Sequence, residues 1–180
     1  MNRSASAAFA AVMVLTGAAA AQSIDFSKVG EKVTDLGHRT YWIEGAGGNT
    51  TVAIGNDGII MVDGQFAPLH DKLKAAIAKM SDKPIKFLIN THYHGDHTGG
   101  NAAFARDGAT VVAQVNVKKR LSEGTTQGLT GAKVPPAPET AWPAKTYAAD
   151  LAKRVGANEQ QSTSFVRVIY NSLKKPAAKS

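Results

Sequence analysis

Hydrophobic and polar residues alternate in the first half of the chain with the periods of strands and then of a helix. β-rich runs at Thr40–Glu44 and 51–54 predict two strands, and the turn-forming tetrapeptide 55–58 joins the second run to a third at Ile59–Val62. Leucine, isoleucine and methionine then recur at helical spacing over residues 68–81. This half therefore predicts neighbouring antiparallel strands followed by an amphipathic helix.

The middle of the chain continues with alternating strand and helix patterns. The apolar run Ile85–Asn90 predicts a buried strand, and a short helix is expected at Asn101–Arg106. A further strand at 110–113 and a further helix at 115–122 follow. This succession predicts an α/β (or α+β) domain, with a sheet covered on one face by helices.

Regular patterns weaken towards the C-terminus. Residues 124–143 are rich in glycine, threonine and proline, and the prolines and alanine at 135–138 forbid regular structure, so we expect a long loop. One more strand is expected at 165–170. The last residues, 174–180, are expected to fray.

Residues 1–21 have the layout of a secretory signal peptide. Arg3 forms a short basic region, an apolar stretch runs to Leu15, and small residues end at Ala21, after which we expect cleavage. The stretch is too short and too weakly hydrophobic for a membrane-spanning helix, which needs about 20 apolar residues. We therefore expect an exported protein, periplasmic or secreted, with no stable membrane anchor.

The composition narrows the possible chemistry. The chain has no cysteine, so any metal must be bound by histidine and carboxylate. The formal net charge is +7, but the basic residues, such as Lys118, Lys119 and Arg120, are scattered and lack interleaved aromatic residues. Nucleic-acid-binding surfaces combine clustered basic residues with interleaved aromatic residues, so we expect no nucleic-acid partner.

One hexapeptide directly downstream of the predicted buried strand carries four metal-ligating side chains. These are His92, His94, Asp96 and His97. In an extended segment the first two histidines point to the same side, and Gly95 can let the chain turn so that the last two ligands face the same space. Two neighbouring ions could be bound in this way. The alternative is a polar surface loop that happens to hold three of the chain's five histidines.

Residues 91–100 resemble the signature of the metallo-β-lactamase-fold hydrolases, His-x-His-x-Asp-His with threonine before it and Gly-Gly after it. Residues 58–64 resemble that family's second landmark, a strand that ends in an aspartate, here Asp63. The resemblance covers about residues 40–147. It implies the N-terminal half of a metallo-β-lactamase-type αβ/βα sandwich, incomplete in this chain, with one or two zinc ions and a small-molecule substrate.

The resemblance also implies roles for individual residues. His92 and His94 would bind the first zinc, Asp96 and His97 the second, and Asp63 would orient the ligands from behind. A metal in such a site lowers the pKa of its bound water, and the resulting hydroxide attacks an ester, amide or lactam-type bond. Asp96 would orient that nucleophile, and is the expected catalytic residue. Asp63 has a second interpretation, as the residue that opens the turn at Gly64.

The chain departs from the family pattern after His97, because it contains no further histidine. Family members place a third histidine for the first metal and a last histidine for the second metal in that downstream region. Two hypotheses follow. The chain is an exported zinc hydrolase, or it is a truncated, non-catalytic family member with a partial metal site. The expected organisation is a signal peptide at 1–21, a metallo-β-lactamase-like domain at 22–150 and a divergent tail at 151–180.

Overall fold

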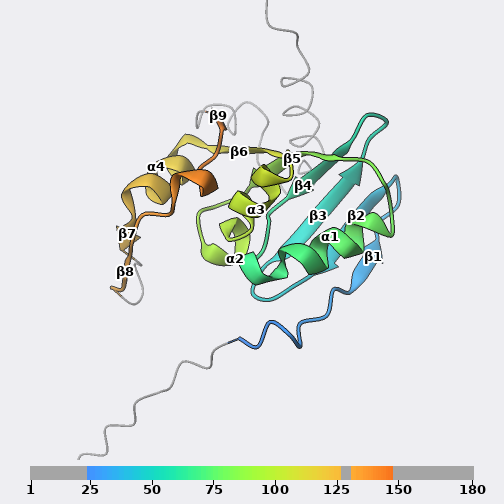
Figure 1. Cartoon of the computed structure of the whole chain (residues 1–180), viewed down its shortest axis with the longest axis horizontal. Helices are drawn as coiled ribbons and strands as arrows, with labels where there is room; N and C mark the ends of the chain where they lie inside the picture. The colour runs from blue at the N-terminus through green and yellow to red at the C-terminus, as the bar shows by residue number, and fades with distance from the viewer. Residues whose placement is uncertain (1–23, 127–130, 148–180) are drawn as a thin grey trace, which may run out of the picture.

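The computed structural model describes residues 24–126 and 131–147. The predicted signal peptide, the tail from residue 151 onwards and the predicted strand at 165–170 lie outside these ranges. Within them, seven strands form one mixed sheet in the order β1-β2-β3-β4-β5-β6-β9 (Figure 1). The predicted α/β class is confirmed. Over the same ranges, no helix has the length and apolar character needed to cross a bilayer.

Four antiparallel strands make up the N-terminal half of the sheet. They are β1 (Val33–Asp35), β2 (Thr40–Glu44), β3 (Asn49–Ile54) and β4 (Ile59–Val62). The three strands predicted from the sequence are confirmed, although β3 begins two residues before the predicted start. Strand β1 was not predicted, because three residues are too few to show an alternating pattern.

The C-terminal half of the sheet is parallel. Strands β5 (Ile85–Asn90), β6 (Thr110–Gln114) and β9 (Lys145–Tyr147) each run parallel to the preceding neighbour, starting from β4. Parallel neighbours need crossover connections, and helices provide the first two. All of these strands therefore end at one edge of the sheet, which is where the chemically important residues lie.

Helices α1 (His70–Ala78) and α3 (Asn101–Arg106) cover one face of the sheet and close the main core. Leu73 and Ile77 from α1 and Phe104 from α3 pack against the inward-facing side chains of the strands. The helix predicted over 68–81 is shorter than expected. It is preceded by the 3-10 turn η1 (Ala67–Leu69), and the N–H groups of Met80 and Ser81 both bond to the Ile77 carbonyl as the helix ends.

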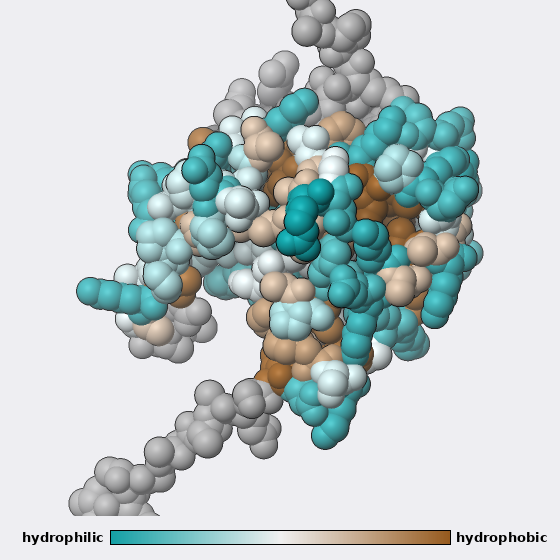
Figure 2. Space-filling view, viewed as in Figure 1, coloured by the Kyte–Doolittle hydropathy of each residue, from teal (hydrophilic) through white to brown (hydrophobic). Residues whose placement is uncertain are grey.

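The opposite face of the sheet carries a second, smaller apolar cluster. Ile60, Ile89 and Val112, one from each of β4, β5 and β6, are buried there together. Apolar side chains on both faces are typical of parallel strands. Figure 2 views the molecule from the side of α1, where polar residues dominate and apolar residues show in separate patches, one of them at the lower edge.

The region predicted as one long loop contains short regular elements. Helix α4 (Val115–Glu123) is followed by a two-stranded hairpin of β7 (Thr125–Thr126) and β8 (Lys133–Val134), and then by the 3-10 turn η2 (Glu139–Ala141). Residues 135–138 lie between these elements, as the prolines require. The expectation of an unstructured stretch over 124–143 is therefore wrong in part, because elements of two or three residues leave no periodic signal.

Candidate metal centre

The candidate site lies at the edge of the sheet where the parallel strands β4 and β5 end. Asp63 follows β4 directly, and Thr91 and His92 follow β5. Because parallel neighbours end at the same edge, Asp63 and Thr91 become neighbours although 28 positions separate them in the sequence. This edge of an open sheet is the usual place for a binding site.

A single helical turn carries the other candidate ligands. Helix α2 (Gly95–Thr98) begins after His94, whose carbonyl accepts hydrogen bonds from the N–H groups of His97 and Thr98, both at 3.0 Å. The turn brings Asp96 and His97 round towards His92. Gly95 has helical backbone angles, so the turn does not use the left-handed conformation that glycine permits.

The four candidate ligands lie together in space. Potential ligand atoms of His92, Asp96 and His97 all lie within 4.8 Å of one another. His92 Nε2 is 3.1 Å from His94 Nδ1, and His97 Nε2 is 3.3 Å from Asp96 Oδ2. The rings of His92 and His97 are stacked obliquely, with centroids 3.9 Å apart. The cluster thus consists of two adjacent pairs, with His94 joined to the rest through His92.

Asp63 is buried behind the cluster and is connected to both pairs. Its Oδ1 accepts a hydrogen bond from the Thr91 N–H at 2.8 Å, and its Oδ2 accepts one from the Thr91 hydroxyl at 2.7 Å. The same Oδ2 lies 2.8 Å from His97 Nδ1, and the Thr91 oxygen lies 3.1 Å from His92 Nδ1. Asp63 therefore does more than open the turn at Gly64.

This arrangement assigns a tautomer to two of the histidines. Both ring nitrogens of His97 face carboxylates, which can only accept, and the shorter contact assigns the single proton of a neutral ring to Nδ1, which lies 2.8 Å from Asp63, whereas Nε2 lies 3.3 Å from Asp96. The Thr91 hydroxyl gives its one hydrogen to Asp63 and can only accept from His92, whose proton also belongs on Nδ1. The Nε2 atoms of His92 and His97 thus carry lone pairs that point into the cluster, that of His92 towards His94 Nδ1 and that of His97 towards Asp96 Oδ2.

The surroundings of His92 favour its neutral form. Partial burial, and then the neighbouring imidazoles of His97 and His94, hold the pKa of His92 below its ordinary value of 6.5. Neutral imidazole is the form that binds a metal ion. The donor set, three imidazoles and one carboxylate without thiolate, fits zinc or a similar divalent ion.

Hydrogen bonds to the main chain fix the position of the ligand-bearing turn. The carbonyl of His97 accepts from the Gly64 N–H at 2.7 Å and from the Asn90 side-chain amide at 3.3 Å. The carbonyl of His94 accepts from the Thr98 hydroxyl at 3.0 Å. Asn101, the first residue of α3, makes no side-chain cap, and its Oδ1 accepts from the Asn90 side-chain amide.

The two remaining histidines lie away from the cluster. His38 is in the turn between β1 and β2, where its φ is +52°. His70 is buried at the start of α1. Its Nδ1 lies 2.7 Å from Asp71 and its Nε2 lies 3.1 Å from Asp107, so it links α1 to the end of α3.

Sequence reasoning missed three sets of residues that shape the site. Thr91 was noted only as part of the signature, and Gln65 was not singled out at all. The pair Gly47 and Gly48 lies against Asp96 and His97. A Gly-Gly pair in a hairpin loop was the one available signal, because it often marks a close approach of the backbone.

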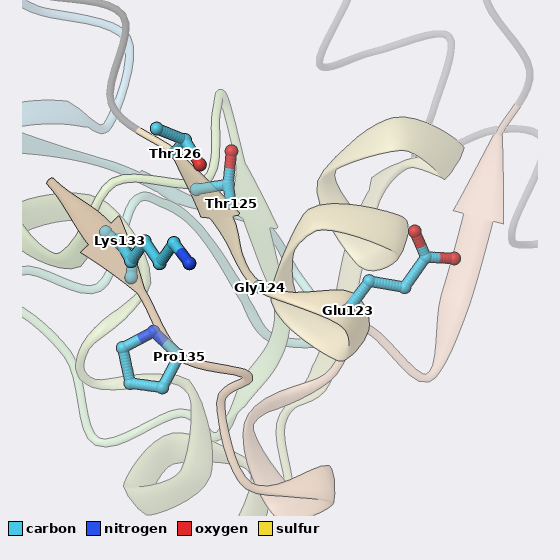
Figure 3. A pocket seen from close by; sticks show the side chains of 7 residues that line it. Glu123, Gly124, Thr125, Thr126, Lys133 and Pro135 are labelled. Carbon is cyan, nitrogen blue, oxygen red and sulfur yellow. The ribbon is translucent and has the colours of Figure 1, made fainter. Parts of the chain in front are cut away.

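A surface hollow of about 590 Å³ lies elsewhere, between the end of α4 and the β7–β8 hairpin (Figure 3). Lys133 points into the space beside Gly124, and Thr125 and Thr126 form the opposite strand. None of the four candidate ligands lines this hollow. The candidate ligands and the hollow are therefore separate features.

Comparison with known proteins gives consistent matches. The sequence model of the metallo-beta-lactamase superfamily matches residues 43–162. A linear primary-alkylsulfatase of Pseudomonas sp. (strain ATCC 19151) is 36% identical over 76 residues, which cover 40% of this chain and 14% of that enzyme.

Solved structures with the same fold include two subclass B3 metallo-beta-lactamases. One, isolated from a soil metagenome library, is 27% identical, with a TM-score of 0.55 over 67% of this chain and 46% of that one. The other, from Bradyrhizobium japonicum, is 26% identical, with a TM-score of 0.55 over 68% of this chain and 47% of that one. The chain thus spans less than half the length of these relatives.

Proposed function

The chain belongs to the metallo-beta-lactamase superfamily, and on that premise we propose that it is a zinc-dependent hydrolase whose metal ligands are His92, His94, Asp96 and His97. Its mixed sheet and covering helices correspond to the N-terminal part of the family's sandwich, as the sequence predicted. The proposed reaction is attack of hydroxide on an ester, amide or lactam-type bond of a small molecule.

The observation that carries this proposal is the orientation of the two imidazoles by Asp63. The carboxylate, directly and through Thr91, keeps the protons of His97 and His92 on Nδ1. Two Nε2 lone pairs are thereby presented beside His94 and Asp96 before any metal arrives. A polar surface loop would have no need of a buried carboxylate with this hydrogen-bond pattern.

When bound, zinc supplies a Lewis acid that polarises the scissile bond and lowers the pKa of water to near neutrality. His92 and His94 would hold one ion, and Asp96 and His97 a second. Asp96, whose Oδ2 faces His97, would accept a hydrogen bond from the attacking water and so orient it. Asp63 would keep the imidazoles in the binding tautomer throughout.

Zinc stoichiometry and turnover of the purified full chain test the proposal. Substrates should include a chromogenic β-lactam, a lactone and a primary alkyl sulfate, the last because the alkylsulfatase is among the relatives. We expect tight zinc binding and turnover that is lost in His94→Ala but retained in the matched control His38→Ala. No tight zinc in the wild-type chain would contradict the proposal.

A second candidate function is that of a non-catalytic family member with a partial metal site. The observation in its favour is that His97 is the last histidine of the sequence, so the chain itself offers only two histidines to the first ion. A catalytic zinc ordinarily has three protein ligands and one water. Zinc binding without turnover of any substrate class would support this candidate over the first.

Export of the protein is also proposed, on the basis of residues 1–21. Expression with the complete N-terminus, followed by mass spectrometry of the mature protein, should find Gln22 as the first residue. An intact N-terminus in the recovered protein would contradict export through this signal. We also propose that a metallo-β-lactamase-like domain follows the signal peptide, at residues 22–150, and that a divergent tail follows it at 151–180.

A further inference from the structure

Gln65 is a fully buried polar residue that binds the loop between β2 and β3. Its side-chain Oε1 accepts from the Ala46 N–H at 3.2 Å, and its Nε2 donates to the Gly48 carbonyl at 2.5 Å. A Cβ atom at Gly45 would overlap the Gln65 carboxamide. One side chain thus makes both of its polar contacts with the backbone of a single loop, residues 45–48.

The same loop lies against the proposed second pair of ligands. A Cβ atom at Gly47 would be 2.9 Å from Asp96 Oδ2, and one at Gly48 would be 2.9 Å from Cε1 and Nε2 of His97. Real Cβ atoms do not approach this closely, so only glycine fits at these two positions without moving a ligand. The backbone of the loop therefore forms one wall of the cluster.

The main chain of Gln65 is connected to the other side of the cluster. Its carbonyl accepts from the Gly100 N–H at 2.9 Å, just beyond the ligand-bearing turn. Its φ is +57°, a left-handed conformation that directs the side chain and the carbonyl to these two partners. Gln65 therefore links the glycine wall to the segment that carries Asp96 and His97.

A loop with three glycines needs such a partner to hold one conformation. Glycine loses more backbone freedom on ordering than any other residue, and it has no side chain to pack. Gln65 supplies two directional contacts in a site from which water is excluded, where hydrogen bonds are strong. Without Gln65 the loop would take several conformations, and the side chains of Asp96 and His97 would lose a fixed neighbour on that side.

We propose that Gln65 is a positioning residue that holds the glycine wall 45–48 against Asp96 and His97 and so sets the side-chain orientation of this ligand pair. The inference rests on the proposed function in taking these two residues as metal ligands. It adds a residue that touches neither metal nor substrate. It also explains the glycines at 47 and 48, whose replacement would displace a ligand directly.

Two measurements on the full chain test this role. The first is a titration with cobalt(II), followed by visible absorption. The second is the NMR spectrum of the imidazole ¹⁵N nuclei in the metal-free protein. In Gln65→Leu we expect cobalt affinity to fall by about 10–100-fold, as for other residues that orient ligands. The visible spectrum should change, and the His97 signals should shift or broaden without metal. Gly48→Ala should reproduce these effects while the Gln65 side chain is intact.

Ile77→Ala is the matched control, because it removes buried apolar contacts in α1 without touching the wall. It should lower stability and leave cobalt affinity and the His97 signals as in the wild type. Wild-type values for Gln65→Leu would overturn the inference, whatever Gly48→Ala shows. If the wild-type chain binds no cobalt, the proposed function fails, and the metal-free His97 signals still decide the role of Gln65.

Discussion

The side-chain amides of Asn90 and Asn101 donate hydrogen bonds to each other, at 3.0 and 2.9 Å, and both residues are completely buried. Asn90 ends β5 and also donates to the His97 carbonyl, and Asn101 begins α3 and also donates to the Ala141 carbonyl. All four amide hydrogens are thus used. This pair closes the ligand-bearing turn at its base, because it joins the residues on either side of that turn.

Loss of one amide should be costly. In Asn101→Leu the Asn90 amide and the Ala141 carbonyl lose their partners in the interior, and we expect a loss of about 1–3 kcal/mol in the free energy of unfolding for each group left unsatisfied. Urea unfolding measures it. The double variant with Asn90→Leu should lose less than the sum of the two single changes, and additive losses would show that the two amides act independently.

Replacement of Asp63 by asparagine should weaken metal binding. Asparagine tolerates the left-handed φ of +63° at this position, so the backbone is retained. It has one acceptor oxygen in place of two, however, and cannot accept all three hydrogen bonds that Thr91 and His97 give to the carboxylate. Zinc affinity should fall by about 10–100-fold, as measured by competition with a chromophoric chelator. Asp35→Asn, at the last residue of β1, is the control, and equal affinities of the two variants would contradict this role.

The carboxylate of Asp107 should make the stability of the fold decrease at acidic pH. The Lys74 ammonium, which donates to its Oδ2 at 2.5 Å, holds the pKa of Asp107 below its usual value of 3.8, and His70 adds to this effect. A pKa lowered by folding gives stabilisation that is complete above the unfolded-state pKa and is lost as the pH falls through the folded-state value.

Melting temperatures of the wild type and Asp107→Asn from neutral pH down to pH 3 measure this effect. The advantage of the wild type should be constant at neutral pH and should shrink below about pH 4. Asp82→Asn, at an exposed position, is the control. An advantage that did not change with pH would show that the charge of Asp107 contributes nothing.

Lys72 should hold the N-terminal segment of the described chain. Its ammonium donates to the carbonyls of Phe26, Ser27 and Val29, at 2.8, 2.8 and 2.7 Å. Lys72→Met keeps the aliphatic stem and removes these charge-assisted bonds, so the free energy of unfolding should fall by about 1.5–3 kcal/mol. Hydrogen exchange of residues 26–29 should accelerate. Lys79→Met, at the C-cap of the same helix, should change neither quantity, and equal exchange in the two variants would refute the assignment.

Local sequence patterns were sufficient to predict the helices and strands that are long enough to show a hydrophobic period. Strands β2, β4 and β5 have the predicted bounds, because a turn signal or an apolar run delimits each of them. Strand β1 and the β7–β8 hairpin escaped prediction because two or three residues contain no period. The buried position of His70 escaped because it depends on Asp107, 37 positions away.

The sequence by itself determined the family and the supply of ligands, since His92, His94, Asp96 and His97 stand within one hexapeptide and need only one local turn to meet. Only the tertiary structure decided what surrounds them. Asp63 bonds to Thr91, beside the cluster, across 28 positions of the chain. Gln65 bonds to the glycine wall across 17 and 19 positions. The contacts of Asp63 exist because the parallel strands β4 and β5 end at one edge of the sheet, and those of Gln65 because the antiparallel strand β3 begins beside the end of β4. No pattern of neighbouring residues records which strand ends will be adjacent.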